Sequence, residues 1–302
     1  MWYWPVSAGT PGAVNTSARI RNTKGARCLN VNLRLNQALD QWHEWGLNDA
    51  RPPVAIRRLP GGLTNQNFSL QCGPHHLVLR LNHTDDKRLN ILRPVELAIQ
   101  RYMAHIGFSP KVHYVSEEQG YWVRDYVAGN VLQTDLLTSD TLAGMARLLH
   151  SVHHIDIRHL EIPPLEFSVK AMRYLTLLKQ EQPQHIGMLT ELEDCVLKVG
   201  EGLPEGYSLC HMDPLPANWI SQPSGLLTLL DWEYAARAHP LLDFAAVYRA
   251  LPGHLRPLWL KAANVGDESY WAMALRQVGL LEKLWLVAEG QAGITSLRDE
   301  IR

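Results

Sequence analysis

The sequence lacks the features that would place it in several broad classes of protein. No apolar run among its 302 residues approaches the roughly 20 residues of a membrane-spanning helix. A formal net charge of −1 gives no support to nucleic-acid binding, which needs a basic surface. The four cysteines are scattered without a C-x-x-C pair, which favours reduced thiols over a disulfide or zinc framework. We therefore expect a cytoplasmic globular protein without a nucleic-acid or membrane partner, and nothing in the sequence indicates its oligomeric state.

Acidic residues are also missing from the first 39 positions, which contain five basic and many small polar residues. This composition overlaps with that of organelle transit peptides. We predict a poorly ordered extension over residues 1–40, with targeting or a peripheral contact as the alternative. Apolar residues at helical spacing predict a helix at about residues 34–46, which leads into the first domain.

Residues 211–218 read H-x-D-x-x-x-x-N, and a D-W-E triplet follows at 231–233. Short apolar runs bounded by turn residues predict strands before, between and after these groups. Asp213 and Asn218 then lie at the two ends of a short loop, and Asp231 follows the next strand. Phosphoryl transfer from a nucleotide needs a carboxylate facing the acceptor hydroxyl, with an amide and a second acid to hold magnesium. Protein kinases have the same H-x-D-x-x-x-x-N spacing, followed downstream by D-F-G. The histidine of the kinase pattern holds the loop in place, and we expect the same role for His211.

The region before this motif predicts a hairpin that covers phosphates. Strands are expected at 54–59, 68–72 and 77–81, with a glycine-rich turn at 60–67. Backbone N–H groups in such a turn, together with one cation on the third strand, can bind a triphosphate. The candidate nucleotide contacts are Gly61, Gly62, Thr64, Asn65 and the cation Arg80.

A helix is predicted from Pro94, where proline suits the first turn. Glu96 lies beside its apolar stripe and could pair with Arg80; a solvated helix charge is the alternative. A further hairpin at 110–127 ends at a break over 128–130, where we expect a linker whose backbone binds the adenine edge. Asp125 and Val127 are the candidate residues there. The histidines at 150, 153, 154 and 159 have no accompanying carboxylate or cysteine pair, so surface or helix-end positions are expected rather than a metal site.

These motifs resemble the aminoglycoside phosphotransferase/choline kinase superfamily, which has a protein-kinase-like fold. The resemblance covers residues 54–290, and residues 209–235 are most similar to bacterial thiamine kinases. It implies an α+β, two-lobed structure with a small antiparallel β-rich N-lobe over 41–128, which includes the helix with Glu96. A larger, mainly helical C-lobe over 129–302 would contain the catalytic loop, the magnesium site and the acceptor site.

The resemblance also implies a role for each site residue. Asp213 would be the catalytic base or would position the acceptor hydroxyl, and Asn218 and Asp231 would be magnesium ligands. Glu233 would be a further metal ligand or an acceptor contact. Arg80 would bind phosphate with Glu96 as its partner, so the implied cofactors are ATP and Mg²⁺.

The function implied is phosphorylation of a small primary alcohol that carries a positive charge, most simply thiamine to thiamine phosphate in a salvage route. Choline or ethanolamine and aminoglycosides are the alternative acceptors, and a non-catalytic nucleotide-binding pseudokinase is the alternative from another class. Residues 236–239 depart from the family's glycine-acid run, which weakens the assignment of the acceptor. The C-terminal aromatic residues Trp259, Tyr270, Trp271 and Trp285 would either contact such a cation or pack in the core.

Overall fold

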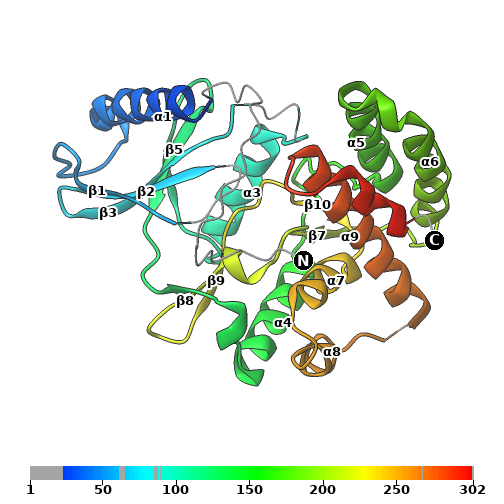
Figure 1. The fold of residues 1–302 in the computed structure, drawn as a ribbon. Helices are drawn as coiled ribbons and strands as arrows, with labels where there is room; N and C mark the ends of the chain where they lie inside the picture. Colours follow the sequence, from blue (N-terminus) through cyan, green and yellow to red (C-terminus); the bar gives the residue numbers. More distant parts are fainter. Residues whose placement is uncertain (1–22, 61–64, 85–87, 89, 267, 301–302) are drawn as a thin grey trace, which may run out of the picture. The chain divides into compact units, whose positions relative to one another are not determined.

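The computed structural model describes residues 23–60, 65–84, 88, 90–266 and 268–300 (Figure 1). The chain forms two compact units: residues 1–85 with 110–127, and residues 86–109 with 128–302. One boundary between these units falls between residues 127 and 128. Helix α3 (Arg93–His105), which the sequence assigned to the N-lobe, groups with the second unit. The division into lobes at 41–128 and 129–302 stays a prediction.

An antiparallel five-stranded sheet forms the first unit, in the order β1-β2-β3-β5-β4. Its inward residues alternate along the central strands, as the period of two in a half-buried sheet requires. Phe68, Leu70 and Cys72 on one strand meet Leu77 and Leu79 on the next in a single apolar core. The strands are β1 (Val54–Arg58), β2 (Gln66–Cys72), β3 (His75–Leu81), β4 (Val112–Val115) and β5 (Tyr121–Asp125).

Helix α1 (Thr23–Asp40) corrects the prediction for the N-terminal region. It begins well before the predicted start at 34, and a 3₁₀ turn (Trp42–Glu44) follows it. Val31, Leu35 and Leu39, spaced four residues apart, pack against the sheet's core. The Arg34 guanidinium donates to the backbone carbonyls of residues 82 and 120 at 2.8 and 3.0 Å. Residues 23–40 are therefore helical, and residues 1–22 of the predicted extension lie outside the described residues.

The second unit is mainly helical and has two small sheets, in the orders β6-β8-β9 and β10-β7. Its helices after α3 are α4 (Ser139–His153), α5 (Phe167–Glu181), α6 (Ile186–Gly200), α7 (Leu241–Ala250), α8 (Arg256–Ala263) and α9 (Glu268–Ala288). Its strands are β6 (Asn130–Val131), β7 (Ser208–Cys210), β8 (Trp219–Ser221), β9 (Leu227–Leu229) and β10 (Ala236–Ala238). Short 3₁₀ turns are at Thr134–Leu136, Pro183–His185, Pro216–Asn218 and Ile294–Glu300.

Three buried tryptophans in the core of the second unit form hydrogen bonds through their indole N–H groups. The indole N–H groups of Trp219, Trp232 and Trp259 donate to the Pro214 carbonyl, the Ser109 hydroxyl and the Phe244 carbonyl, each at 2.9 Å. A buried tryptophan needs such a partner, because an unpaired N–H in an apolar core is costly. The α+β class predicted from the sequence is confirmed. No described helix is long and apolar enough to cross a membrane.

The linker at 128–130 gives a test of the fold. Gly129 has φ +148°, and a Cβ there would lie 2.3 Å from the Ser221 carbonyl oxygen, so Gly129→Ala should lower the free energy of unfolding by about 2–3 kcal/mol. Urea unfolding measures this. Gly253→Ala is the matched control, because a Cβ at Gly253 meets nothing within 4 Å. Equal stability of the two variants would contradict the backbone assigned to the linker.

Candidate active site

The predicted catalytic loop follows strand β7 and brings two of its polar groups together. The Asn218 side-chain amide donates to the Asp213 carbonyl at 2.8 Å and to the Asp213 carboxylate at 2.9 Å. The backbone N–H of Leu230 donates to the Asn218 carbonyl at 2.9 Å, which places the start of D-W-E beside the loop. Met212 and Asp231 have φ values of 67° and 70°. Non-glycine residues in this region store strain and concentrate at functional sites.

His211 supports the loop as a neutral side chain. Its Nε2–H donates to the Leu230 carbonyl at 2.9 Å, so Nδ1 is left to accept the backbone N–H of Asp213 at 3.3 Å. Its ring packs against Trp232, with 4.7 Å between ring centroids. Burial lowers the pKa of His211 to about 4. The geometry agrees with the structural role expected from the sequence.

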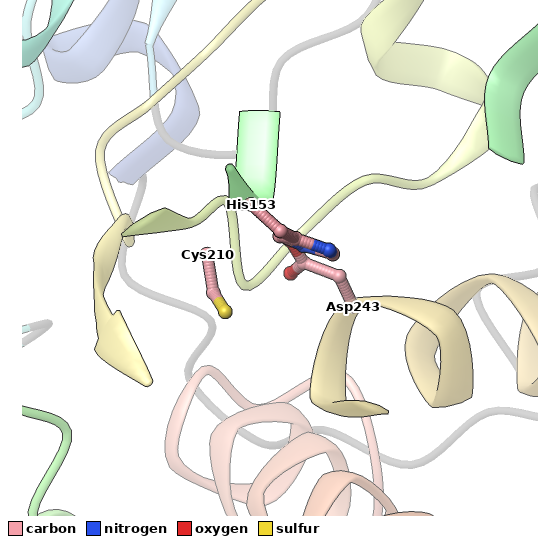
Figure 2. A group of neighbouring side chains, drawn as sticks. All are labelled: His153, Cys210 and Asp243. Carbon is pink, nitrogen blue, oxygen red and sulfur yellow. The ribbon is translucent and has the colours of Figure 1, made fainter. Parts of the chain in front are cut away.

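The fully buried Asp243 of helix α7 fixes the backbone just before Asp213. Its carboxylate accepts the N–H groups of His211 and Met212 at 2.8 and 2.7 Å and the ring N–H of His153 at 2.9 Å. Figure 2 shows this carboxylate with His153 and Cys210. Ligand atoms of these three residues lie within 4.8 Å of one another. Three N–H groups already donate to the Asp243 carboxylate. We therefore assign the cluster of His153, Cys210 and Asp243 to fixing the loop rather than to binding a metal ion.

His153 differs in part from the sequence prediction for the histidines. It does end helix α4, as expected, but it is buried and bonded to Asp243 rather than exposed. The sequence missed Asp243 because the L-L-D-F start of α7 reads as a core helix. A carboxylate inside such an apolar run was the available signal, since buried charges require partners.

Acidic groups crowd the other side of the loop. Ligand oxygens of Glu96, Asp231 and Glu233 lie within 4.8 Å of one another. Burial, and then the charge of Asp231, raises the pKa of the Asp213 carboxyl well above its ordinary value. Carboxylate and amide oxygens are the ligands that Mg²⁺ prefers. Asn218, Asp231 and Glu233 have oxygens of this kind, and their role as metal ligands stays a prediction.

Glu96 has a partner that the sequence did not suggest. Arg93, three residues earlier on α3, donates through Nη1 to Glu96 at 2.7 Å and to Glu233 at 3.2 Å. All three side chains are buried. A pair between Glu96 and Arg80 would join the two units and stays a prediction.

A cavity of about 200 Å³ lies beside Glu233 and is lined by helix α5 and the residues after D-W-E. The Lys170 ammonium stands 5.0 Å from the centre of the Tyr234 ring. Burial lowers the pKa of Lys170 to about 8, while the charges of Asp213 and Glu233 act in the opposite direction. The Tyr234 hydroxyl accepts the indole N–H of Trp285 at 3.1 Å. The sequence gave no sign of Lys170, because it lies in no motif.

The candidate nucleotide residues other than Glu96 belong to the first unit. Arg80 is buried and lies 4.3 Å from the centre of the Trp122 ring. The Asn65 side chain accepts the N–H of His83 at 3.2 Å, and the Asp125 carboxylate pairs with His113 at 2.6 Å. Val127 follows the end of β5. The predicted contacts Gly61, Gly62 and Thr64 lie outside the described residues, and all these roles stay predictions.

An antiparallel sheet unit, a helical unit, and a loop that joins Asp213 to Asn218 beside D-W-E together define a kinase-like phosphotransferase. A family model described as "Phosphotransferase enzyme family" matches residues 55–276. The chain belongs to this family. The superfamily predicted from the sequence, and with it the enzyme class, is confirmed.

Known proteins of this kind are similar over much of the chain. Thiamine kinase of an Escherichia coli strain is 30% identical over 190 residues, which are 62% of this chain and 63% of that protein. The match thus spans less than two thirds of the relative. Choline kinase LicA from Streptococcus pneumoniae has a TM-score of 0.68 at 19% identity, covering 82% of this chain and 92% of that one. The streptomycin–ATP complex of APH(2'')-IIa has a TM-score of 0.62 at 18% identity, covering 82% and 91%. These likenesses show the fold.

Stability should depend on pH through His211. Its folded-state pKa of about 4 lies below its ordinary value of 6.5, so the unfolded chain binds a proton first as the pH falls. The contribution of neutral His211 to the free energy of unfolding is complete above pH 6.5. It falls by about 3 kcal/mol as the pH is lowered towards 4. Between pH 7 and pH 4.5, the free energy of unfolding measured in urea should fall less for His211→Asn than for the parent protein. The same loss in both would contradict the assignment, and the exposed His254→Asn is the control.

Replacing the Asp243 carboxylate should disturb the loop at 211–218. Asp243→Asn puts an amide donor against N–H donors, so we expect a loss of about 3 kcal/mol in the free energy of unfolding and a lower kcat. Denaturant unfolding and steady-state kinetics measure the two effects. Asp140→Asn, an exposed aspartate on α4, is the matched control. Parent-like values for both variants would show that Asp243 does not fix the loop.

Proposed function

We propose that this protein transfers the γ-phosphoryl group of ATP to the primary hydroxyl of thiamine, giving thiamine phosphate in a salvage route. The observation that carries the proposal is the pairing of Asn218 with Asp213 beside the D-W-E carboxylates. It occurs in a chain that is 30% identical to thiamine kinase over the matched residues. The cytoplasmic location expected from the cysteines belongs to this proposal.

In the proposed reaction, Asp213 accepts the proton of the acceptor hydroxyl. The hydroxyl oxygen bonds to the γ-phosphorus, the bond from that phosphorus to the bridging oxygen breaks, and ADP leaves. Magnesium, when bound, would neutralise charge on the phosphates, and Asn218 and Asp231 would hold it. The raised pKa of Asp213 suits a group that takes up a proton. Use of ATP is supported by neighbours of the same fold in complexes with AMP and with ATP.

The cavity beside Glu233 supports a positively charged acceptor. The cavity is lined by Glu233 and Tyr234, and carboxylates and aromatic faces are the groups that bind a cation. Thiamine has a primary alcohol and a fixed positive charge, so it fits this chemistry. Choline shares both properties and is the second candidate acceptor, favoured by the structural likeness to choline kinase. Ethanolamine and aminoglycosides are the further alternatives.

Asp213→Ala should lower kcat by about 10²–10⁴-fold, because general-base catalysis is lost. Binding of Mg·ATP should change little, since the lost contact matters in the transition state. Coupled ADP release measures turnover, and calorimetry measures nucleotide binding. Near-normal turnover would refute the role of Asp213. Asp156→Ala is the control for an aspartate outside the site.

The acceptor is identified by ADP release with thiamine, choline, ethanolamine and an aminoglycoside at matched concentrations. We expect the highest kcat/KM with thiamine. A higher value with choline would move the assignment to the second candidate. Tight Mg·ATP binding without ADP release from any acceptor would favour the non-catalytic pseudokinase.

A further inference from the structure

We propose that Lys170 selects the acceptor: its side-chain amine donates to a nitrogen or oxygen atom of the acceptor and disfavours an ammonium alcohol whose reacting hydroxyl is its sole hydrogen-bonding group. The inference rests on the proposed phosphorylation of an alcohol and names the class of alcohol that the site takes. Thiamine belongs to the favoured class, because its pyrimidine ring has nitrogen atoms that accept hydrogen bonds. Choline and ethanolamine belong to the disfavoured class.

Lys170 is a cation in the wall of the cavity beside Glu233, near the start of helix α5. Its ammonium lies 5.0 Å from the centre of the Tyr234 ring. Within the described residues this ammonium forms no hydrogen bond and no ion pair. The lowered pKa of Lys170, about 8, has burial as its largest cause. A cation that is partly removed from water without an anionic partner is costly, so its donors are available to a ligand in the cavity.

The described charges around this cavity are balanced rather than acidic. Its lining side chains include three carboxylates and two cations: Glu96, Glu166, Glu233, Lys170 and Arg173. Arg93 adds a third cation, since its Nη1 contacts Glu96 at 2.7 Å and Glu233 at 3.2 Å. Like charges repel more strongly where water is excluded. An acceptor that offers nothing but a positive charge is therefore repelled by Lys170.

An acceptor with a further lone pair can use the same lysine. A lysine amine donates N–H bonds whether it is charged or neutral. A site built to donate to a substrate atom rejects analogues that lack the atom, because its donor is then left unpaired. The cation of thiamine can face Tyr234 and Glu233 while its pyrimidine accepts from Lys170. The charge of Asp213 acts on Lys170, so an acceptor bound beside this lysine is near the catalytic loop.

The test compares three acceptors by coupled ADP release, with the full chain and saturating Mg·ATP. They are thiamine, choline, and the thiazolium half of thiamine methylated where the pyrimidine arm was attached. The last compound keeps the primary alcohol and the positive charge but lacks the pyrimidine nitrogens. In Lys170→Met we expect kcat/KM for thiamine to fall by about tenfold, mainly through KM, because a binding contact is lost. For the other two acceptors kcat/KM should rise by about tenfold, because the repulsion is removed.

Two further lysine variants separate the hydrogen bond from the charge. Lys170→Gln keeps a donor without the charge, so kcat/KM for thiamine should stay within about threefold of the parent value. The value for choline should still rise by about tenfold. Lys179→Met is the matched control on the same helix, because Lys179 pairs with Glu193 of α6 at 2.7 Å and does not line the cavity. It should leave all three values unchanged.

The proposal is overturned if Lys170→Met keeps the parent preference among the three acceptors. An equal fall in kcat with all three would also overturn it, since Lys170 would then act on phosphoryl transfer. Circular dichroism checks folding, and if Lys170→Met does not fold, an unchanged value for choline in Lys170→Gln refutes the selection.

Failure of the proposed function appears separately, as a parent protein that releases no ADP with thiamine or choline. Calorimetric binding of the same three compounds to the parent protein and to Lys170→Met then tests Lys170 alone. We expect the variant to lose affinity for thiamine relative to the other two. Equal effects on all three compounds would count against the proposal.

Discussion

The carboxylate of Asp243 accepts the backbone N–H groups of His211 and Met212, and the position of Asp213 depends on this interaction. A loop can aim a catalytic side chain only when its backbone is fixed, because the side chain inherits the position of its Cα atom. Met212 has a left-handed backbone conformation that would not persist without support. The Asp243 carboxylate stabilises that conformation by accepting the Met212 N–H. At the other end of the loop, the Asn218 amide donates to the Asp213 carboxylate.

A second constraint is charge. The site gathers several carboxylates in a partly buried place, and burial together with the charge of Asp231 raises the pKa of Asp213. The protein meets this with two cations from different helices, Arg93 on α3 and Lys170 on α5. Arg93 is held by short ion pairs, whereas Lys170 lies over an aromatic ring beside a cavity. The first arrangement fixes side chains, and the second places a cation beside the cavity.

The sequence predicted what depends on local pattern. Alternating apolar residues in β2 and β3, and the spacing of Asp213 and Asn218, follow from chain geometry within short segments. The α+β class, the superfamily and the meeting of the loop with D-W-E could therefore be predicted. Arg93, Lys170 and Asp243 could not, since their importance comes from partners far along the chain. Helix α1 was predicted to start too late because its first half is polar, and only Val31 extends towards it the stripe of Leu35 and Leu39 that the prediction used.

The hydrogen bond between Trp285 and Tyr234 has a consequence for how such proteins diversify. Tyr234 lines the cavity beside Glu233, but its hydroxyl is oriented by Trp285, near the end of α9. A substitution in that last long helix can therefore reshape this cavity while every motif residue stays the same. Comparison of related sequences therefore has to include the C-terminal helix as well as the loop.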